Sequence, residues 1–280
     1  MTLNCRIYRG LALVVATMIV TGLIGACARL ADAPEPAAAG LSSPALVHAD
    51  QAMIVAGHPL AAEAGRKVLA AGGHAIDAAI AAQMVLTLVE PQSSGIGGGG
   101  FLLYYDAMGD RTVAFDGREV APTSARETMF LDAEGQPRAF HDAVVGGLSV
   151  GVPGLVRMLE AAHDDFGRLP WSDLFAPAIT HAEEGFVVSP RLHQVIAADA
   201  YLKTFKGPAA YFFTANGEPL AAGSLLRNPD LAATLRAIAS GGASAFYTGA
   251  IAEDVAQTVS TAPRNPASMT VADLASYQAI

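Results

Sequence analysis

The sequence is almost without cysteine. Only Cys5 and Cys27 occur among its 280 residues, and both lie in the first 27. The body that follows therefore has no disulfide and no thiol chemistry.

Signatures of metal, nucleotide and serine-hydrolase sites are also missing. The seven histidines are scattered, without His-Glu-x-x-His or another ligand spacing, so neither a metal nor a cofactor is expected. Gly95-x-Gly97-x-x-Gly100 matches the dinucleotide fingerprint in letters, but a helical pattern precedes it and a strand pattern follows, which reverses the order that the fingerprint needs. Ser93-Ser94-Gly95 is not the Gly-x-Ser-x-Gly turn of a hydrolase triad.

Charge is scarce, and acidic residues outnumber basic ones. Charged residues make up 15% of the chain and hydrophobic residues 52%, with a formal net charge of −9. Loss of residues 1–26 would remove two arginines and no acids, which changes the charge to −11. This composition predicts a large apolar core and argues against a nucleic-acid partner, which normally requires a basic face.

Residues 1–27 have the pattern of a bacterial export signal. Arg6 and Arg9 precede an apolar run of 16 residues, which is short for a membrane span and typical of a signal sequence. The run ends in Leu-Ile-Gly-Ala-Cys27, which resembles a lipobox and makes Cys27 a lipidation candidate; ordinary signal-peptidase cleavage is the alternative. Either way we expect export, to the periplasm or as a membrane-anchored lipoprotein. Residues 28–49 are expected to form a linker and residues 50–280 a domain.

The body predicts a helix-rich α+β fold with a few strands, all before residue 120. Met53–Ala56 is expected to form a buried strand, and residues 205–222 are expected to be irregular. Asp77 is expected in the first turn of a helix, where an acid complements the helix dipole. The helices are expected at 60–71, 75–89, 155–166, 171–184, 190–202, 228–240, 245–259 and from Thr270, and a strand hairpin at 101–106 and 111–116. His181 falls within one of these helices, where packing explains it best.

The stretch from Glu90 to Pro122 carries the most chemistry. Residues 95–100 contain five glycines, which indicates a backbone that turns sharply or lies close to something. Arg118 then follows the second strand between Asp116 and Glu119. From spacing alone, a surface ion pair and a guanidinium fork for a substrate carboxylate are equally good interpretations.

Several blocks together resemble the γ-glutamyltranspeptidase (glutathione hydrolase) family. They cover about residues 50–280 in family order and spacing. The blocks are His58-Pro-Leu-Ala61, Gly72-Gly-x-Ala-x-Asp-Ala-Ala79, Glu90-Pro-x-Ser-Ser-Gly-Ile-Gly-Gly-Gly-Gly-Phe101, Asp116-Gly-Arg-Glu-x-Ala-Pro122, Gly151-x-Pro-Gly154, Ala176–Phe186, Phe246–Ala252 and Met269–Tyr277.

The resemblance implies an N-terminal-nucleophile hydrolase with αββα layers, present here only as the helix-rich large-subunit portion. It implies γ-glutamyl transfer and hydrolysis by a threonine that self-cleavage exposes at the start of a small subunit. The partners would be a donor such as glutathione, an acceptor amino acid or peptide or water, and that small subunit. Arg118 would bind the donor α-carboxylate, and Asp116, Glu119, Ser94, Gly97 and Gly98 would support it.

One departure from the family pattern concerns the nucleophile. No Thr-Thr-His segment occurs, so we expect no catalytic residue within this sequence. We expect the chain to be the N-terminal part of a precursor and to be inactive on its own. Apolar sheet edges would then be exposed. Two alternatives are a relative that acts as a cephalosporin/glutaryl acylase or processes poly-γ-glutamate, and an exported non-catalytic binding protein or fragment.

Overall fold

The computed structural model describes residues 46–280. The expected signal segment, Cys27 and most of the linker lie outside these residues. Residues 46–49, at the end of that linker, are exposed and belong to no helix or strand. Within the described range, no helix combines the length and the apolar character that crossing a membrane requires.

Two packed helices begin the body, as the sequence predicts. Helix α2, Pro59–Ala70, begins where the His58 ring accepts a hydrogen bond from the Leu60 amide, and Pro59 suits its first turn. Gly72 adopts φ +89°, which turns the chain into α3, Ala75–Val89. Helix α3 has no basic residue and one acid, Asp77, and most of its side chains are buried.

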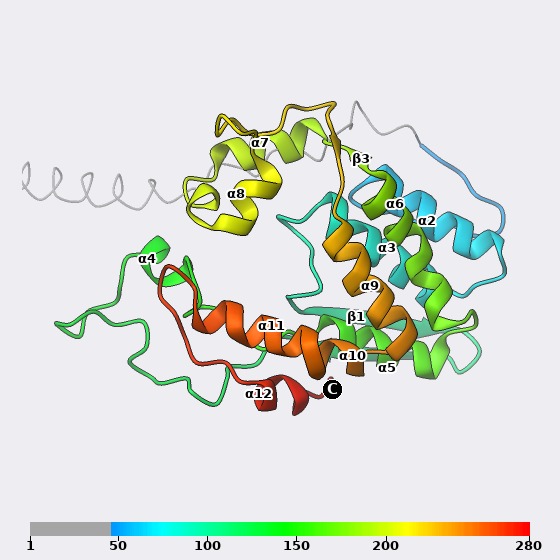
Figure 1. Ribbon diagram of the computed structural model, residues 1–280. Helices are drawn as coiled ribbons and strands as arrows, with labels where there is room; N and C mark the ends of the chain where they lie inside the picture. Colours follow the sequence, from blue (N-terminus) through cyan, green and yellow to red (C-terminus); the bar gives the residue numbers. More distant parts are fainter. Residues whose placement is uncertain (1–45) are drawn as a thin grey trace, which may run out of the picture. The chain divides into compact units, whose positions relative to one another are not determined.

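Four further segments pack around α3 and its neighbours (Figure 1). Helix α5 spans Leu155–Phe166, the 3₁₀ helix η1 spans Trp171–Phe175, α6 spans Ala176–Glu184, and α9 spans Pro229–Gly241. The Trp171 indole donates to the Ile238 carbonyl at 3.0 Å, and its ring meets those of Phe175 and His163 edge-on. Apolar surface from several helices is thereby removed from water, which is the main driving force for this packing.

Asp77 does more than complement the dipole of α3. It is fully buried, and its carboxylate accepts from the amides of His74 and Arg168. The ring of His163 lies 3.6 Å away. A buried carboxylate needs such partners, so Asp77 joins the start of α3 to the segment that follows α5.

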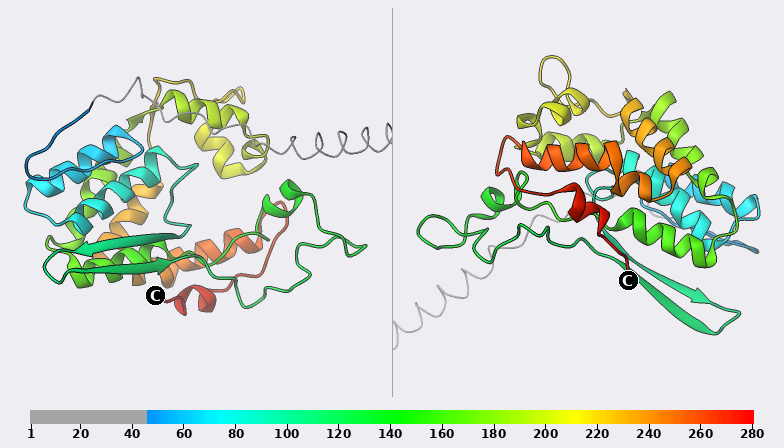
Figure 2. Two further views of the ribbon diagram at one scale, coloured as in Figure 1. Left: turned by 180° about the vertical axis from the view of Figure 1, so that it is seen from behind. Right: turned by 60° about the horizontal axis from the view of Figure 1, so that its bottom comes forward.

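The predicted hairpin is confirmed. Strands β1, Gly100–Asp106, and β2, Arg111–Gly117, pair antiparallel from Gly100↔Gly117 to Asp106↔Arg111. The inner face packs on α5, whereas Phe101, Leu103 and Tyr105 on the other face are 59–77% exposed. The two arrows lie beside α5 in Figure 2. The sequence predicts exposed apolar sheet edges here, whereas the apolar surface that the hairpin exposes is mainly one face of the sheet.

The remaining elements are short, apart from one helix of 12 residues. They are α4 (Phe140–Val144), β3 (Phe186–Val187), α7 (Pro190–Ala198), η2 (Leu202–Thr204), α8 (Lys206–Phe212), β4 (Leu225–Leu226), α10 (Ser244–Tyr247), α11 (Gly249–Ser260) and α12 (Val271–Ala275). Strands β3 and β4 form a second two-stranded sheet.

Four sequence predictions about these elements are wrong. Met53–Ala56 forms no strand, because no described segment pairs with it, and Val55 is 86% exposed. Residues 206–212 are helical within the stretch predicted to be irregular, since a proline in the first turn, Pro208, removes no helical hydrogen bond. Strands β3 and β4 lie after residue 120. The helix predicted at 245–259 is two helices, because Gly249 has φ +64°.

Asp273 caps α12 and ties it to a distant loop. Its carboxylate accepts from the Thr270 amide and hydroxyl and from the Thr123 amide, at 2.7–2.9 Å. Burial acts to raise the pKa of Asp273, but these hydrogen bonds outweigh it and lower the pKa to about 2. The folded state therefore favours the ionised form.

We expect Asp273→Asn to lower the free energy of unfolding by about 2 kcal/mol near pH 7. Because the folded-state pKa is depressed, the wild-type contribution is present above pH ~4 and disappears as the pH falls toward ~2. Urea titrations between pH 2 and 7 test this, with the exposed Asp254→Asn as control. Equal acid sensitivity of wild type and Asp273→Asn would contradict it.

Candidate functional site

A cleft of about 730 Å³ lies where α3, the glycine loop (residues 95–100) and the start of α5 meet. It brings together four residues that the sequence predicts for the site: Ser94, Gly97, Gly98 and Glu119. The other lining residues are Ala79, Gln83, Pro91, Ser93, Gly95, Gly99, Gly100, Phe101, Leu102, Leu103, Leu155, Met158 and Leu159. Arg118 and Asp116 do not line it, although Arg118 is paired with Glu119, which does.

The glycine loop is built for close approach. No glycine from 95 to 100 has a positive φ, so none is required by a left-handed turn. A Cβ on Gly99 would clash with the Gly117 carbonyl and lie 2.8 Å from Glu119 Oε2, whereas one on Gly97 would meet nothing within 4 Å. Of the two sequence interpretations, close contact is therefore confirmed, and it applies to Gly99.

The loop is also fastened to α5. The Gly98 carbonyl accepts from the amides of Gly154 and Leu155, at 3.0 and 3.1 Å. These amides belong to the first turn of the helix, where amides have no partner within the helix. The backbone of the loop and the start of α5 therefore hold each other in place.

Arg118 follows β2 with its backbone fixed and its side chain exposed. Its amide donates to Asp116 Oδ1 at 2.8 Å, and its carbonyl accepts from the Tyr277 hydroxyl at 2.8 Å. Its guanidinium is 67% exposed and lies 3.0 Å from Glu119 Oε2. The arginine side of this pair is exposed and the Glu119 side chain is 27% exposed, so the guanidinium keeps donors that face solvent and can bind a ligand carboxylate.

Tyr277 and Ile280 surround the same strand end. The backbone of Asp116 exchanges two hydrogen bonds with that of Ile280, at 2.6 and 2.9 Å. Burial, followed by the charges of Asp116 and Glu119, raises the pKa of the Tyr277 hydroxyl. Tyr277 therefore remains a neutral donor at neutral pH and keeps its bond to Arg118.

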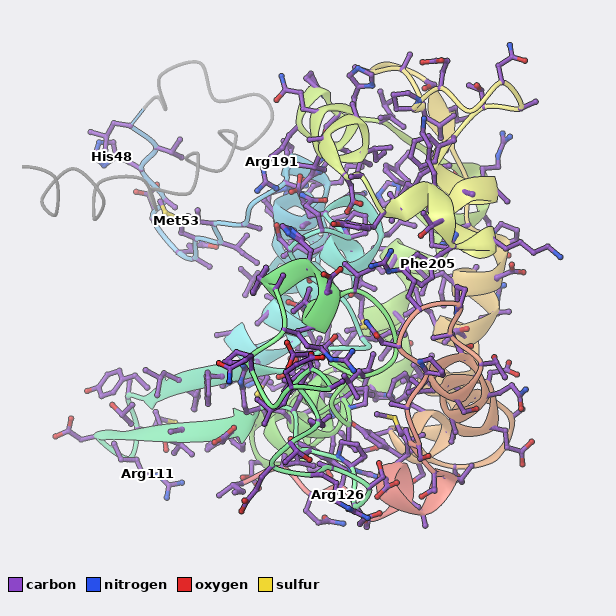
Figure 3. The ribbon with its side chains drawn as sticks, turned by 90° about the vertical axis from the view of Figure 1, so that its left-hand side faces the viewer. His48, Met53, Arg111, Arg126, Arg191 and Phe205 are labelled. Atoms are coloured by element: carbon purple, nitrogen blue, oxygen red, sulfur yellow. The ribbon has the colours of Figure 1, made fainter. Side chains whose placement is uncertain are left out.

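A buried ion pair that sequence reasoning missed supports the loop. Glu90, which directly follows α3, pairs with the guanidinium of Arg191 in α7, and both side chains are less than 10% exposed. Arg191 also reaches Ser93 Oγ at 3.5 Å. The partners are 101 positions apart, so the local sequence carries no signal of the pairing. Glu90 at the end of an apolar helix was the available clue, because a buried acid needs a counter-charge. Figure 3 labels Arg191.

A second hollow contains His58 and His181. Burial lowers the pKa of both rings; for His181 the charge of Lys67 acts in the same direction, whereas for His58 Glu90 opposes it. His181 is half-buried in α6, in line with the packing role expected for it. Among residues 46–280 no group of three or more side chains is placed to hold a metal.

The comparisons with known proteins concern nearly the whole described chain. Residues 61–280 match the family model described as gamma-glutamyltranspeptidase. The glutathione hydrolase proenzyme of Bacillus subtilis (strain 168) is 43% identical over 225 residues, which are 80% of this chain and 38% of that protein. The chain thus spans about two fifths of this relative.

Two solved structures are similar in fold. The gamma-glutamyltranspeptidase of Helicobacter pylori superposes with a TM-score of 0.78 at 35% identity, over 84% of this chain and 66% of that one. A cephalosporin acylase from Bacillus halodurans gives a TM-score of 0.68 at 33% identity, over 79% and 41% of the respective chains.

The two glycines Gly97 and Gly99 should respond differently to a methyl group. We expect Gly99→Ala to lower the free energy of unfolding by about 1–3 kcal/mol through overpacking. Gly97→Ala should be neutral or stabilise by up to ~1 kcal/mol, because the site is open and the unfolded chain loses freedom. Chemical denaturation compares the two, and equal stability would refute the close-approach interpretation.

Removal of the Arg191 guanidinium should leave the buried Glu90 carboxylate without this cation. We expect Arg191→Met to lower the free energy of unfolding by about 3–5 kcal/mol, and Glu90→Gln in the same chain to restore part of that loss. Arg66→Met, at an exposed ion pair with Glu63, should change it by less than ~1 kcal/mol. Similar losses at Arg66 and Arg191 would contradict the assignment.

Proposed function

The chain belongs to the gamma-glutamyltranspeptidase family, and from this membership we propose that it supplies the substrate-carboxylate site of an enzyme that transfers or hydrolyses γ-glutamyl groups. The observation that carries the proposal is Arg118, whose backbone is fixed on both sides and whose exposed guanidinium is held by Glu119 beside the cleft. Glutathione is the expected donor, since glutathione hydrolases are among the relatives.

The expected fold class is confirmed. The described residues form a helix-rich α+β structure with few strands, and they resemble 66% of the chain of a solved gamma-glutamyltranspeptidase. The fold is therefore that of an N-terminal-nucleophile hydrolase.

The proposed mechanism divides recognition from attack. Arg118 would hold the α-carboxylate of the γ-glutamyl group by two parallel charge-assisted hydrogen bonds. A small-subunit threonine, which is not among these residues, would attack the γ-carbonyl, with its own amine as base. An ester would form as the peptide amine leaves with the proton. Water or an acceptor amine would then release the glutamyl group.

The proposed structural partner is the small subunit of the same precursor. The bare apolar face of Phe101, Leu103 and Tyr105 supports this, because a second sheet packed at ~10 Å would remove it from water. This arrangement would correspond to the two inner layers of an αββα fold.

Two alternative functions lead to different tests. In the first alternative, suggested by the likeness to a cephalosporin acylase, the substrate is a carboxylate-bearing amide other than a γ-glutamyl compound. Poly-γ-glutamate is a further candidate substrate. Comparing the turnover of γ-glutamyl anilide and glutaryl amide separates these substrates. A non-catalytic exported protein would turn over neither.

For localisation, export to the bacterial periplasm, with lipid attachment at Cys27 as the possible anchor, remains our proposal. It rests on the sequence pattern of residues 1–27 alone.

In the full protein with its small subunit, we expect Arg118→Ala to raise KM for γ-glutamyl donors about 100-fold and Arg118→Lys about tenfold, because lysine retains charge but not the fork. The matched control is Arg111→Ala, at the other end of β2, where the arginine is also exposed and paired with a carboxylate, that of Asp106. An Arg118→Ala enzyme with unchanged KM would refute the carboxylate role.

A further inference from the structure

One face of helix α3 is left uncovered by the other helices. Ala75 and Ala79 are exposed, and Gln83 and Leu86 are partly exposed, at a spacing that places all four on one stripe. Ala79 and Gln83 on this stripe line the cleft. Gln83 is the polar member, so its amide needs a partner at the cleft wall.

That partner is Ser94. Gln83 Nε2 lies 2.5 Å from Ser94 Oγ, and the Ser94 amide donates to the Glu90 carbonyl at 3.0 Å. Both side chains line the cleft. The serine is therefore fixed through its backbone and through its side chain.

The direction of this bond determines where the serine proton can go. An amide nitrogen donates and cannot accept, so Ser94 Oγ is the acceptor. The hydroxyl retains one proton of its own, which must be donated elsewhere. Since Ser94 lines the cleft, an acceptor bound there can receive that proton.

Resting on the function proposed above, we propose that Gln83 is a positioning residue that directs the Ser94 O–H into the cleft, toward a carboxylate or amide oxygen of the γ-glutamyl ligand. Ser94 is then a specificity residue that touches substrate, and Gln83 acts through it. The adjoining backbone fits this role, because an open glycine such as Gly97 lets a ligand approach the loop.

The test is a double-mutant cycle in the full protein, with steady-state kinetics on a γ-glutamyl anilide. We expect Ser94→Ala to raise KM about tenfold and Gln83→Met about fivefold, with kcat changed less than about threefold. Because Gln83 acts through Ser94, the double variant should match Ser94→Ala rather than show the product of both effects. Ser94→Thr, which keeps the hydroxyl, should stay within about threefold of wild type.

The control is Gln257→Met on the exposed surface of α11, which should leave KM and kcat unchanged. Thermal melts establish that each variant is folded, and if Ser94→Ala fails to fold, Ser94→Cys takes its place as a much weaker donor. Unchanged KM in Ser94→Ala, a loss confined to kcat, or multiplicative effects in the double variant would overturn the inference and leave the proposed function standing. A wild-type enzyme without γ-glutamyl turnover would overturn both.

Discussion

The structure depends on the need to cover helix α3. Its 15 residues are apolar on nearly every side, so any side left bare exposes hydrophobic surface to water. Helices α2, α5 and α6 and the 3₁₀ helix η1 all contact it. Two residues of the stripe that they leave bare, Ala79 and Gln83, line the cleft, so the incomplete covering of α3 provides one wall of the site.

The two ends of α3 are secured by buried acids rather than by further apolar contacts. Asp77 at the start binds backbone amides, and Glu90 at the end pairs with Arg191. A buried carboxylate is stable only with such partners, which makes each of these contacts sensitive to geometry. The segment that leads from α3 into the glycine loop starts at Glu90, so the ion pair also fixes the approach to the cleft wall.

Sequence patterns identified most elements because they are local. Helix α3 and helix α5 have the predicted bounds, and the hairpin has the predicted strands. Met53–Ala56 was mispredicted because an apolar run indicates a strand only if another strand pairs with it. The Glu90–Arg191 pair and the Gln83–Ser94 contact could not be read, because they join residues from separate elements. Arg118 could be selected by its place at a strand end, while its fixed backbone and exposed guanidinium depend on Tyr277, far along the chain.

The contacts of Trp171 have a consequence for spectroscopy. It is the sole tryptophan of these 280 residues, its indole is bonded to Ile238 in α9, and it is absent from the cleft lining. Its fluorescence therefore reports how α9 docks on η1. A ligand that fills the cleft without moving these helices is therefore expected to leave the tryptophan emission of this chain unchanged, and a change in that emission on ligand addition indicates a displacement of the helical core.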